Sequence, residues 1–366
     1  MSQFDFSVLA RANPAVLNCN ASIRNQTEHF QVDEQLPFEP EGQGGHVMLR
    51  IQKTHTNTDW LAKQLACFAN VAEVAVGFAG MKDRHAVTTQ WFTVNMEGME
   101  EPDWYQFDSE NWQIKQLTRH NKKLKRGVLS GNHFKITLAD LQGEQQQWQQ
   151  NLQRIQQQGV PNYFAEQRFG HNHANLERAD AWFQGAKAPK KRQQRSIYLS
   201  AARSWLFNLV LSKRIEKGNW NQIISGDVMQ LAGTHSSFFV ADEQDEDLVE
   251  RLQTFDIHPT GPLWGRGEAL TKLSSLKLEQ QVLEAWSSWQ QGLEKAGLKQ
   301  ERRALRLYPE QLTWQFTDTT LELAFYLPAG SYATAVLREL AQITDASQRN
   351  SVSAPPFSVV GALRED

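Results

Sequence analysis

The stretch GFAGMKDRHAVTTQWF, residues 77–92, places a charged turn between two segments with the composition of β-strands. The segment before the turn, VAEVAV (71–76), is apolar and β-branched, and TTQWFTV (88–94) alternates and is rich in strand formers. The turn contains one carboxylate, Asp83, between the cations Lys82 and Arg84. These cations can bind a phosphate beside the carboxylate, which makes Asp83 a candidate nucleophile or general base. An ordinary surface hairpin remains the alternative, because Asp, Lys and Arg are common in turns.

Composition limits the class of protein. The chain has 366 residues, of which 40% are hydrophobic and 22% charged, which suits a globular protein of two domains better than one. Its two cysteines, Cys19 and Cys67, form no CxxC pair, so neither a disulfide framework nor a structural zinc site is expected. No apolar run is long enough to cross a membrane, and the first residues lack the pattern of a secretory signal. We therefore expect a cytoplasmic protein that is not inserted in a membrane.

The charge is unevenly distributed, although the net charge is only −3. No acidic residue lies between Glu110 and Asp140 or between Asp180 and Glu216, and both segments are rich in Lys and Arg. Two positive segments of this kind are typical of surfaces that bind a polyanion. Solvated basic loops are the alternative. The candidate RNA-binding residues in the two segments are Lys122, Lys123, Lys125, Arg126, Lys190, Lys191 and Arg192.

Periodicity predicts a change of character along the chain. Residues 29–36, 44–53 and 133–141 alternate as strands do, whereas residues 57–70 have helical spacing. Residues 143–159 are predicted to form a Gln-rich helix, and residues 160–300 are predicted to be mostly helical. Strands return at 304–330, where two segments suit a hairpin, and a helix is expected at 331–343. The strand-rich ends and helical middle favour a discontinuous domain with an insertion.

Further motifs combine polar and aromatic residues. In RGVLSGNHFKITL (126–138), Asn132 and Phe134 share one face of a strand and offer a hydrogen-bonding amide and a stacking ring. In VPNYFAEQRFGHN (160–172), aromatic residues surround Arg168, as in sites for single-stranded RNA. SGDVMQLAGTH (225–235) and IHPTGPLWGRGEA (257–269) are candidate binding loops. For each motif, a core or turn role is the alternative.

Several classes of site find no support. HNH (171–173) lacks a third ligand at a suitable spacing, so no metal site is expected. The sequence contains no GxGxxG, GxxxxGK[ST] or GxSxG motif, and therefore no dinucleotide, P-loop or α/β-hydrolase site is indicated.

FAGMKDRHAVTTQ, GNHFKITL and PNYFAEQRFG, in this order and spacing, resemble the tRNA pseudouridine synthase D (TruD) family. The resemblance extends to EHFQVDE (28–34), GDVMQLAG (226–233), PTGPLWGRGEA (259–269) and LPAGSYATAVLREL (327–340). It covers most of the chain from about residue 20 to residue 343 and suggests a bacterial member.

The resemblance implies an α+β fold with a mixed, largely antiparallel sheet. Residues 1–157 and 304–346 would form the discontinuous pseudouridine synthase catalytic domain. Residues 158–303 would form the largely helical insertion domain, followed by a C-terminal tail at 347–366.

The resemblance also implies an activity, the isomerisation of uridine to pseudouridine in tRNA, most plausibly at uridine 13 of the D-arm. Asp83 falls on the catalytic aspartate, which either attacks the sugar or abstracts its C2′ proton; both remain open. Phe134 would stack on the flipped uracil, and Asn132 would position Asp83 or the base. The other implied substrate-binding residues are Lys82, Arg84, Arg24 and Phe30, and Arg168 joins the RNA-binding set.

The implied enzyme needs no metal or other cofactor and no obligatory protein partner, acts on tRNA, and is expected to be a monomer. A catalytically silent RNA-binding protein on the same scaffold is the first alternative. An enzyme acting on a free sugar or nucleotide is the second, but the two basic segments argue against a small substrate. Three positions depart from the family pattern: Arg24 replaces a common Lys, Met81 a polar or small residue, and Ala165 a common Gly.

Overall fold

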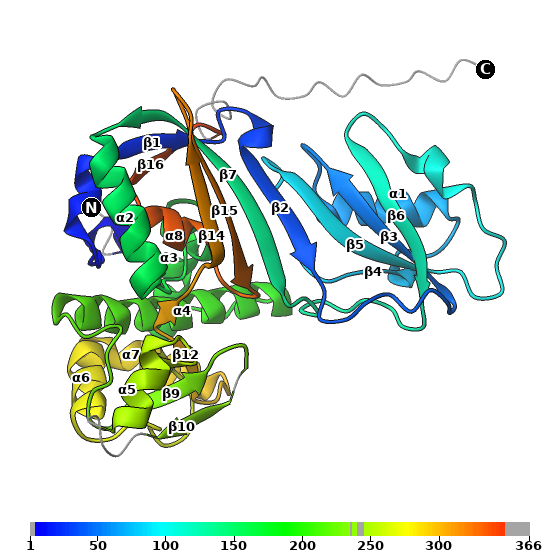
Figure 1. Cartoon of the computed structure of the whole chain (residues 1–366). Coiled ribbons are helices and arrows are strands. Elements are labelled where there is room, and N and C mark those ends of the chain that lie inside the picture. Colours follow the sequence, from blue (N-terminus) through cyan, green and yellow to red (C-terminus); the bar gives the residue numbers. More distant parts are fainter. Residues whose placement is uncertain (1–3, 235, 240–244, 348–366) are drawn as a thin grey trace. The chain divides into compact units, whose positions relative to one another are not determined.

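The computed structural model describes residues 4–234, 236–239 and 245–347, which divide into two compact units (Figure 1). Of the described residues, the sheet unit contains those in 20–142, 313–324 and 343–347, and the helical unit contains those in 4–19, 143–312 and 325–342. These limits differ from the domain limits implied by the family resemblance, which stay a prediction. The expected tail lies, from residue 348 onward, outside the described residues.

The described residues of the sheet unit form one large sheet and a single α-helix. The sheet order is β14-β15-β7-β2-β5-β3-β6, with β4 paired to β5 and β1 paired to both β7 and β16. Its elements are β1 (Asn20–Ile23), β2 (Phe30–Gln35), β3 (His46–Lys53), α1 (Thr58–Phe68), β4 (Val76–Phe78), β5 (Val87–Asn95), β6 (Trp112–His120) and β7 (Gly131–Gln142). β14 (Glu310–Phe316), β15 (Leu321–Pro328) and β16 (Gln342–Asp345) each belong to it in part.

The centre of this sheet mixes the two strand directions. β2 runs parallel to β5 and antiparallel to β7, whereas β3 is antiparallel to both of its neighbours, β5 and β6. Helix α1 covers one face of β3, β5 and β6, where Leu61 and Leu65 pack against Leu49, Ile51 and Phe92. The α+β fold class and its mixed sheet are therefore as predicted.

Most predicted elements of the sheet unit are present. The alternating segments became β2, β3 and β7, and the helix expected at 57–70 is α1, with Asn57 at its N-cap position. Residues 71–76 were expected to form a strand, but they mostly form a turn and a short 3-10 helix at Glu73–Ala75, and β4 begins only at Val76. Strand β6 was not predicted, because only two of its nine residues are buried and its alternation is weak.

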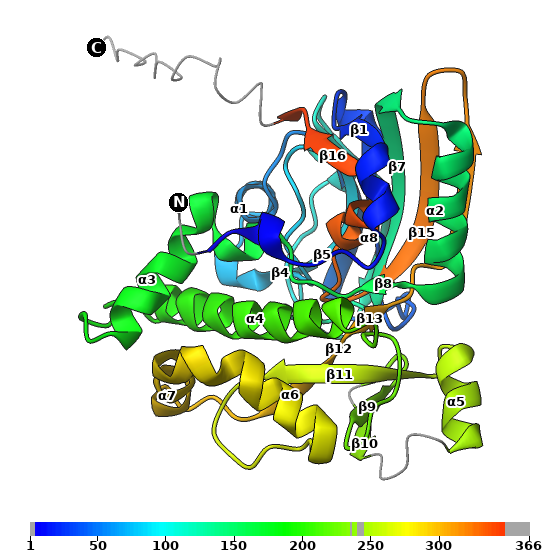
Figure 2. The ribbon, with the colours of Figure 1, turned by 90° about the vertical axis from the view of Figure 1, so that its left-hand side faces the viewer.

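The helical unit is arranged around a long helix, α4, which contacts α3, α6, α7 and β11 (Figure 2). Its α-helices are α2 (Gln145–Gln158), α3 (Ala174–Phe183), α4 (Arg192–Glu216), α5 (Glu246–Gln253), α6 (Leu273–Leu283), α7 (Ser287–Lys295) and α8 (Ala333–Arg338). Its strands are β8 (Val160–Pro161), β9 (Val228–Leu231), β10 (Ser237–Phe239), β11 (Ile257–Leu263), β12 (Glu301–Ala304) and β13 (Arg306–Leu307). Among the described residues, no helix has both the length and the apolar character needed to cross a membrane.

The core of the helical unit explains several motifs that suggested binding. Tyr163 and Phe169 are 1% and 0% exposed and pack with Trp205 and neighbouring rings of α4, so they are unavailable for stacking on RNA. Arg168 is exposed beside them, with its guanidinium carbon 5.6 Å from the Phe164 ring centroid. The aromatic part of this motif is a structural corner.

Parts of the two loop candidates have structural roles. Asp227 of the GDVMQLAG motif is fully buried and accepts hydrogen bonds from Arg214 at 2.9 and 3.1 Å and from Ser275 at 2.7 Å. PTGPLWGRGEA begins inside β11, which pairs with β9 and β12. The helical prediction for residues 160–300 missed this small sheet, because its short strands lack long alternating patterns.

The C-terminal helix is shorter than expected. It was predicted for residues 331–343, but α8 begins after Tyr332 and ends at Arg338. Residues 342–345 instead form β16, which pairs with β1. The Ala165 departure causes no strain, because its φ is −72°, a value that any residue adopts.

Candidate active site

One face of the sheet carries polar and aromatic side chains next to the segment that contains Asp83. Phe30, Val32 and Glu34 of β2 share this face, since side chains alternate along a strand. In the antiparallel register with β7, Val32 is opposite Phe134 and Glu34 is opposite Asn132. Two residues implied as substrate-binding, Asn132 and Phe134, are thus placed on the same face, two positions apart.

The segment between β4 and β5 has no regular structure and is fixed by side-chain hydrogen bonds. Thr58, the first residue of α1, accepts from the Lys82 backbone N–H at 3.1 Å and donates to Gln90 Oε1 at 2.8 Å. The amide of Gln90 in turn donates to the Gly80 carbonyl at 3.1 Å. These bonds fix the backbone directly before Asp83.

The two cations that flank Asp83 in sequence direct their charged groups elsewhere. Lys82 Nζ forms an ion pair with Glu34 at 2.5 Å, and both side chains are at most 6% exposed. Glu34 also accepts from the backbone N–H of Trp91 at 3.2 Å. The ion pair of Lys82 and Glu34 therefore connects the segment between β4 and β5 to the sheet. Arg84 is exposed and donates from Nε to the His55 carbonyl at 3.1 Å. Lys82 is therefore part of the support of the turn in this structure.

The cation that contacts Asp83 is Arg24. Its Nη2 donates to Asp83 Oδ2 at 2.7 Å, and the other carboxylate oxygen accepts from the His85 backbone N–H at 3.0 Å. The Asp83 side chain is 31% exposed, so the bound carboxylate still reaches solvent. Asp83 is consequently held in one orientation while remaining accessible to a substrate.

Arg24 is itself held from several sides. It follows β1 and adopts a left-handed backbone conformation with φ of 59°, which is costly for a residue with a side chain. Nη1 donates to Asp345 of β16 at 2.6 Å, and the guanidinium lies 4.1 Å from the centroid of the Phe30 ring. Its side chain is 5% exposed. Arg24 bridges two carboxylates and one aromatic face, which fixes its planar group.

An aromatic pair continues this arrangement on the sheet. Phe30 and Phe134 contact each other edge to face, with ring centroids 6.2 Å apart. Asn132 Oδ1 is buried and accepts no hydrogen bond from any residue that the structure describes. A buried acceptor without a donor is costly, and a bound substrate group that donates would remove this cost.

A buried lysine lies on the same side of the sheet. Lys53, at the end of β3, is 1% exposed and donates from Nζ to the Thr56 carbonyl at 2.7 Å. Burial lowers the pKa of Lys53 to about 8, with the Asp83 carboxylate acting in the opposite direction and Lys82 adding to the decrease. The backbone segment that Lys53 supports also provides the carbonyl that binds Arg84.

The structure brings together Asp83, Arg24, Phe30, Asn132, Phe134 and Lys82 in the sheet unit, with Arg84 at the edge of the turn. The predicted RNA-binding residues divide between the units. Lys122, Lys123, Lys125 and Arg126 belong to the loop between β6 and β7 of the sheet unit. Arg168, Lys190, Lys191 and Arg192 are exposed on the helical unit.

Sequence reasoning missed four residues of the site: Glu34, Lys53, Thr58 and Asp345. For Glu34 a signal existed, because it follows Phe30 and Val32 on the apolar face of an alternating strand. Lys53 similarly follows Ile51 on the buried face of β3. Asp345 carries no local signal, since it approaches Arg24 from 321 residues away. No cluster of three or more potential metal ligands occurs in the part of the chain that the structure describes.

Comparisons with known proteins identify the family of the chain. The profile of the family described as tRNA pseudouridine synthase D (TruD) matches residues 15–179 and 174–340. A tRNA pseudouridine synthase D from Nitrosococcus oceani is 49% identical over 89% of this chain and 92% of the relative. One from Hydrogenovibrio crunogenus is 45% identical over 94% of this chain and 97% of the relative.

The fold also has a solved counterpart. The crystal structure of a putative tRNA pseudouridine synthase D from Methanosarcina mazei matches with a TM-score of 0.70 at 20% identity. The match covers 90% of this chain and 95% of that one. The mixed sheet and the helices around it thus have the fold of this putative pseudouridine synthase. The chain belongs to the tRNA pseudouridine synthase D (TruD) family.

Proposed function

We propose that the protein is a tRNA pseudouridine synthase that isomerises uridine 13 in the D-arm and uses Asp83 as its catalytic group. The observation that carries the proposal is the placement of Asp83. Its carboxylate is partly exposed, is bound by Arg24, and belongs to the unit whose sheet presents Asn132 and Phe134. Family membership supports the reaction class, because the curated relatives are named as tRNA pseudouridine synthases.

The reaction needs few groups. The N1–C1′ bond of the uridine breaks, the uracil turns, and C5 bonds to C1′; C5 loses its proton to solvent and N1 gains one. Asp83 either attacks the sugar or abstracts its C2′ proton, and both routes use the same exposed carboxylate. No oxidant, reductant or metal is required by this balance, and the proposal includes no cofactor.

The residues around Asp83 have supporting roles in this proposal. The base must leave the RNA stack before a carboxylate can reach the sugar. Asn132 Oδ1 is the buried acceptor for the uracil N–H, and Phe134 is the aromatic contact of the flipped base. Arg24 orients Asp83, and Lys82 acts through the backbone of the turn. Arg84 is exposed and suited to a phosphate.

The basic loop before β7 is proposed to bind the phosphates of the tRNA, and the exposed basic residues of the helical unit are proposed to add further contacts. The side chains of Lys122 and Lys125 form no hydrogen bond or ion pair with any described residue, so both are available for a phosphate. The enzyme is expected to act as a monomer in the cytoplasm, without an obligatory protein partner.

The decisive test is a pseudouridine assay on unmodified tRNA transcript, with modified positions mapped by carbodiimide-dependent stops in primer extension. The wild type should produce a stop at a D-arm uridine, and Asp83→Asn should abolish it while tRNA binding stays within a few-fold. Asp33→Asn is the matched control, because Asp33 is on β2 but pairs with Arg50 at 2.6 Å. A wild type that binds tRNA without forming pseudouridine would favour the silent RNA-binding alternative.

A further inference from the structure

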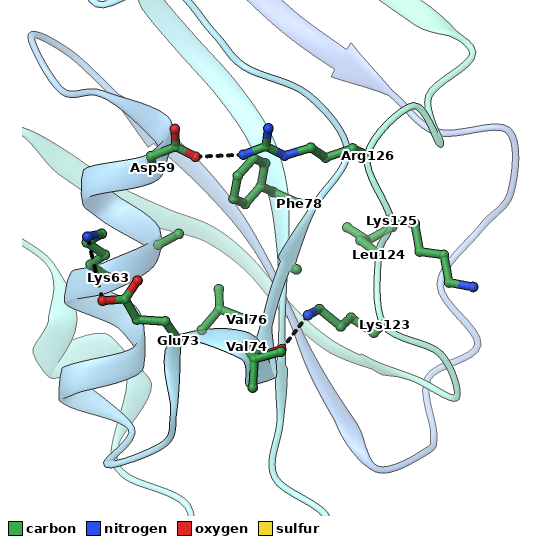
Figure 3. Close-up of a pocket in the computed structure, with 12 residues that line it drawn as sticks. Asp59, Lys63, Glu73, Val74, Val76, Phe78, Lys123, Leu124, Lys125 and Arg126 are labelled. Carbon is green, nitrogen blue, oxygen red and sulfur yellow. Dashed lines mark hydrogen bonds and ion pairs between the residues drawn. The ribbon is translucent and has the colours of Figure 1, made fainter. Parts of the chain in front are cut away.

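The sheet unit contains a pocket that the proposed catalytic residues do not line. It has a volume of about 760 Å³ and lies among α1, the 3-10 helix at Glu73–Ala75, β4 and the loop of residues 123–126 (Figure 3). A volume of this size is typical of sites for small organic groups. We call it the β4 pocket.

The lining of the β4 pocket combines an apolar surface with an aromatic ring. Val76 and Leu124 are buried, and Phe78 is half-buried. The guanidinium of Arg126 lies 5.2 Å from the Phe78 ring centroid, and Figure 3 shows the two groups next to each other. An aromatic ring and a guanidinium plane are the two surfaces on which proteins stack the bases of unpaired RNA.

The charged groups of the rim differ in how far they are already satisfied. Arg126 pairs with Asp59 at 3.0 Å, Lys63 with Glu73 at 3.6 Å, and Lys123 donates to the Val74 carbonyl. Four cations against two carboxylates leave the rim positive.

Lys125 is the exception among the rim cations. Its side chain forms no hydrogen bond or ion pair with any described residue, and in Figure 3 it extends away from the other lining groups. Lys125 at the rim could bind the phosphate of a nucleotide while the apolar interior of the pocket binds its base.

The pocket is also connected to the catalytic segment. Phe78 ends β4, and Asp83 follows five residues later. The intervening chain spans at most about 17 Å when fully extended. The loop that lines the pocket is bound to this segment by the hydrogen bond from the Gly127 N–H to the Ala79 carbonyl at 2.7 Å. The pocket is therefore close enough to Asp83 for a nucleotide near the target to reach it.

We propose that the β4 pocket binds the base of one unpaired nucleotide of the tRNA, close in sequence to the target uridine, with its phosphate at Lys125. This inference rests on the proposed function. It assigns to the pocket the selection of a nucleotide other than the one that reacts. The tRNA would then be positioned by two bases, one flipped to Asp83 and one inserted beside Phe78.

The test couples a change in the pocket to a change in the RNA. Binding of the full-length protein is measured to the intact transcript and to transcripts with a single abasic residue at each unpaired position around the target. Val74→Glu blocks the pocket, because Val74 lines it and is 78% exposed, so the variant should fold normally. Lys122→Glu is the comparison variant, because Lys122 is on the same loop but does not line the pocket.

For one abasic position, the wild type should bind roughly 5- to 100-fold more weakly than it binds intact RNA, which is the range for one stacked base. Lys122→Glu should weaken binding to all transcripts but retain this difference. In Val74→Glu the difference should fall below about 2-fold. If no position shows the effect, or if Val74→Glu retains it, the pocket does not bind a base.

The same samples separate this inference from the proposed function. If the wild type forms pseudouridine but Val74→Glu does not change the effect of the abasic residue on binding, the pocket assignment is wrong and the enzymatic proposal stands. Absence of pseudouridine from every tRNA tested removes both proposals.

Discussion

Arg24 and Asp83, 59 residues apart in the chain, form an ion pair of 2.7 Å in which the arginine is nearly buried and the aspartate is partly exposed. The same guanidinium is bound by Asp345 and lies over the Phe30 ring. An exposed ion pair contributes little, but an arginine with a buried stem that bridges two carboxylates with separate nitrogens fixes the position of both. The orientation of the candidate catalytic carboxylate is thus determined by a residue that is distant in sequence.

The bridging geometry of Arg24 predicts different results for two substitutions. Arg24→Lys keeps the charge but cannot bind Asp83 and Asp345 with separate nitrogens of a planar group, so the turnover number should fall by about 10-fold or less. Arg24→Met leaves two carboxylates without a cation and should reduce turnover much further, with the Michaelis constant changing less. Single-turnover kinetics with the tRNA transcript measures both. An equal decrease of the turnover number in the two variants would contradict the prediction that the charge of residue 24 alone preserves most of the activity.

The basic loop before β7 should contribute to the salt dependence of tRNA binding. Replacing Lys122, Lys123, Lys125 and Arg126 together with Ala should weaken binding and reduce the slope of log K against log salt, because fewer counterions are released. The slope should change by the amount expected for the loss of about two phosphate contacts rather than four, because Lys123 and Arg126 already bind Val74 and Asp59. Binding isotherms at several salt concentrations test this. An unchanged slope would place the RNA path elsewhere.

Lys53 makes folding stability depend on pH in the alkaline range. Burial lowers its pKa from 10.5 to about 8, so between these values the unfolded chain binds more protons than the folded one. The free energy of unfolding should therefore rise with pH over this window, by up to about 3 kcal/mol from this group. The difference between wild type and Lys53→Met, measured by urea denaturation at pH 7.5, 8.5 and 9.5, isolates the effect. A difference that does not change with pH would contradict it.

The buried pair of Arg214 and Asp227 should be structural. Both side chains are at most 2% exposed, and Arg214 also donates to the Asn219 and Gln222 carbonyls. Arg214→Met leaves a buried carboxylate without its partner and should reduce the free energy of unfolding by about 3–5 kcal/mol. The double variant Arg214→Met with Asp227→Asn should recover part of this loss. Thermal unfolding of the full chain tests both, and a mild effect of the single variant would show that the pair is dispensable.

The sheet around the candidate site could be predicted because its strands carry their own pattern. In β7 the alternation of side chains places Asn132 and Phe134 on one face of the strand, and the pairing of β7 with β2 then sets them on the same face as Phe30. The family resemblance then singled out Asp83. In contrast, the sequence indicated that Lys82 and Arg84 lie beside Asp83, but in the structure the cation that contacts Asp83 is Arg24. Local sequence does not determine which distant side chain a turn will meet.

The missed elements share this cause. Residues 342 and 343 fall within the helix predicted for 331–343, yet they belong to β16, which pairs with β1. Tyr163 and Phe169 have the composition of an RNA-stacking motif, but packing against α4 buries them. Composition at these positions is compatible with both outcomes, and the contacts that decide between them come from other parts of the chain.

The pairing of β1 with β16 has a consequence for how the protein matures on the ribosome. Asp83 and Arg24 leave the exit tunnel early, but Asp345, which completes the binding of Arg24, is synthesised 321 residues after it. A nascent chain can form most of the central sheet before this last strand exists. Competence to modify RNA should therefore be acquired only after Asp345 has been synthesised and β16 has paired with β1.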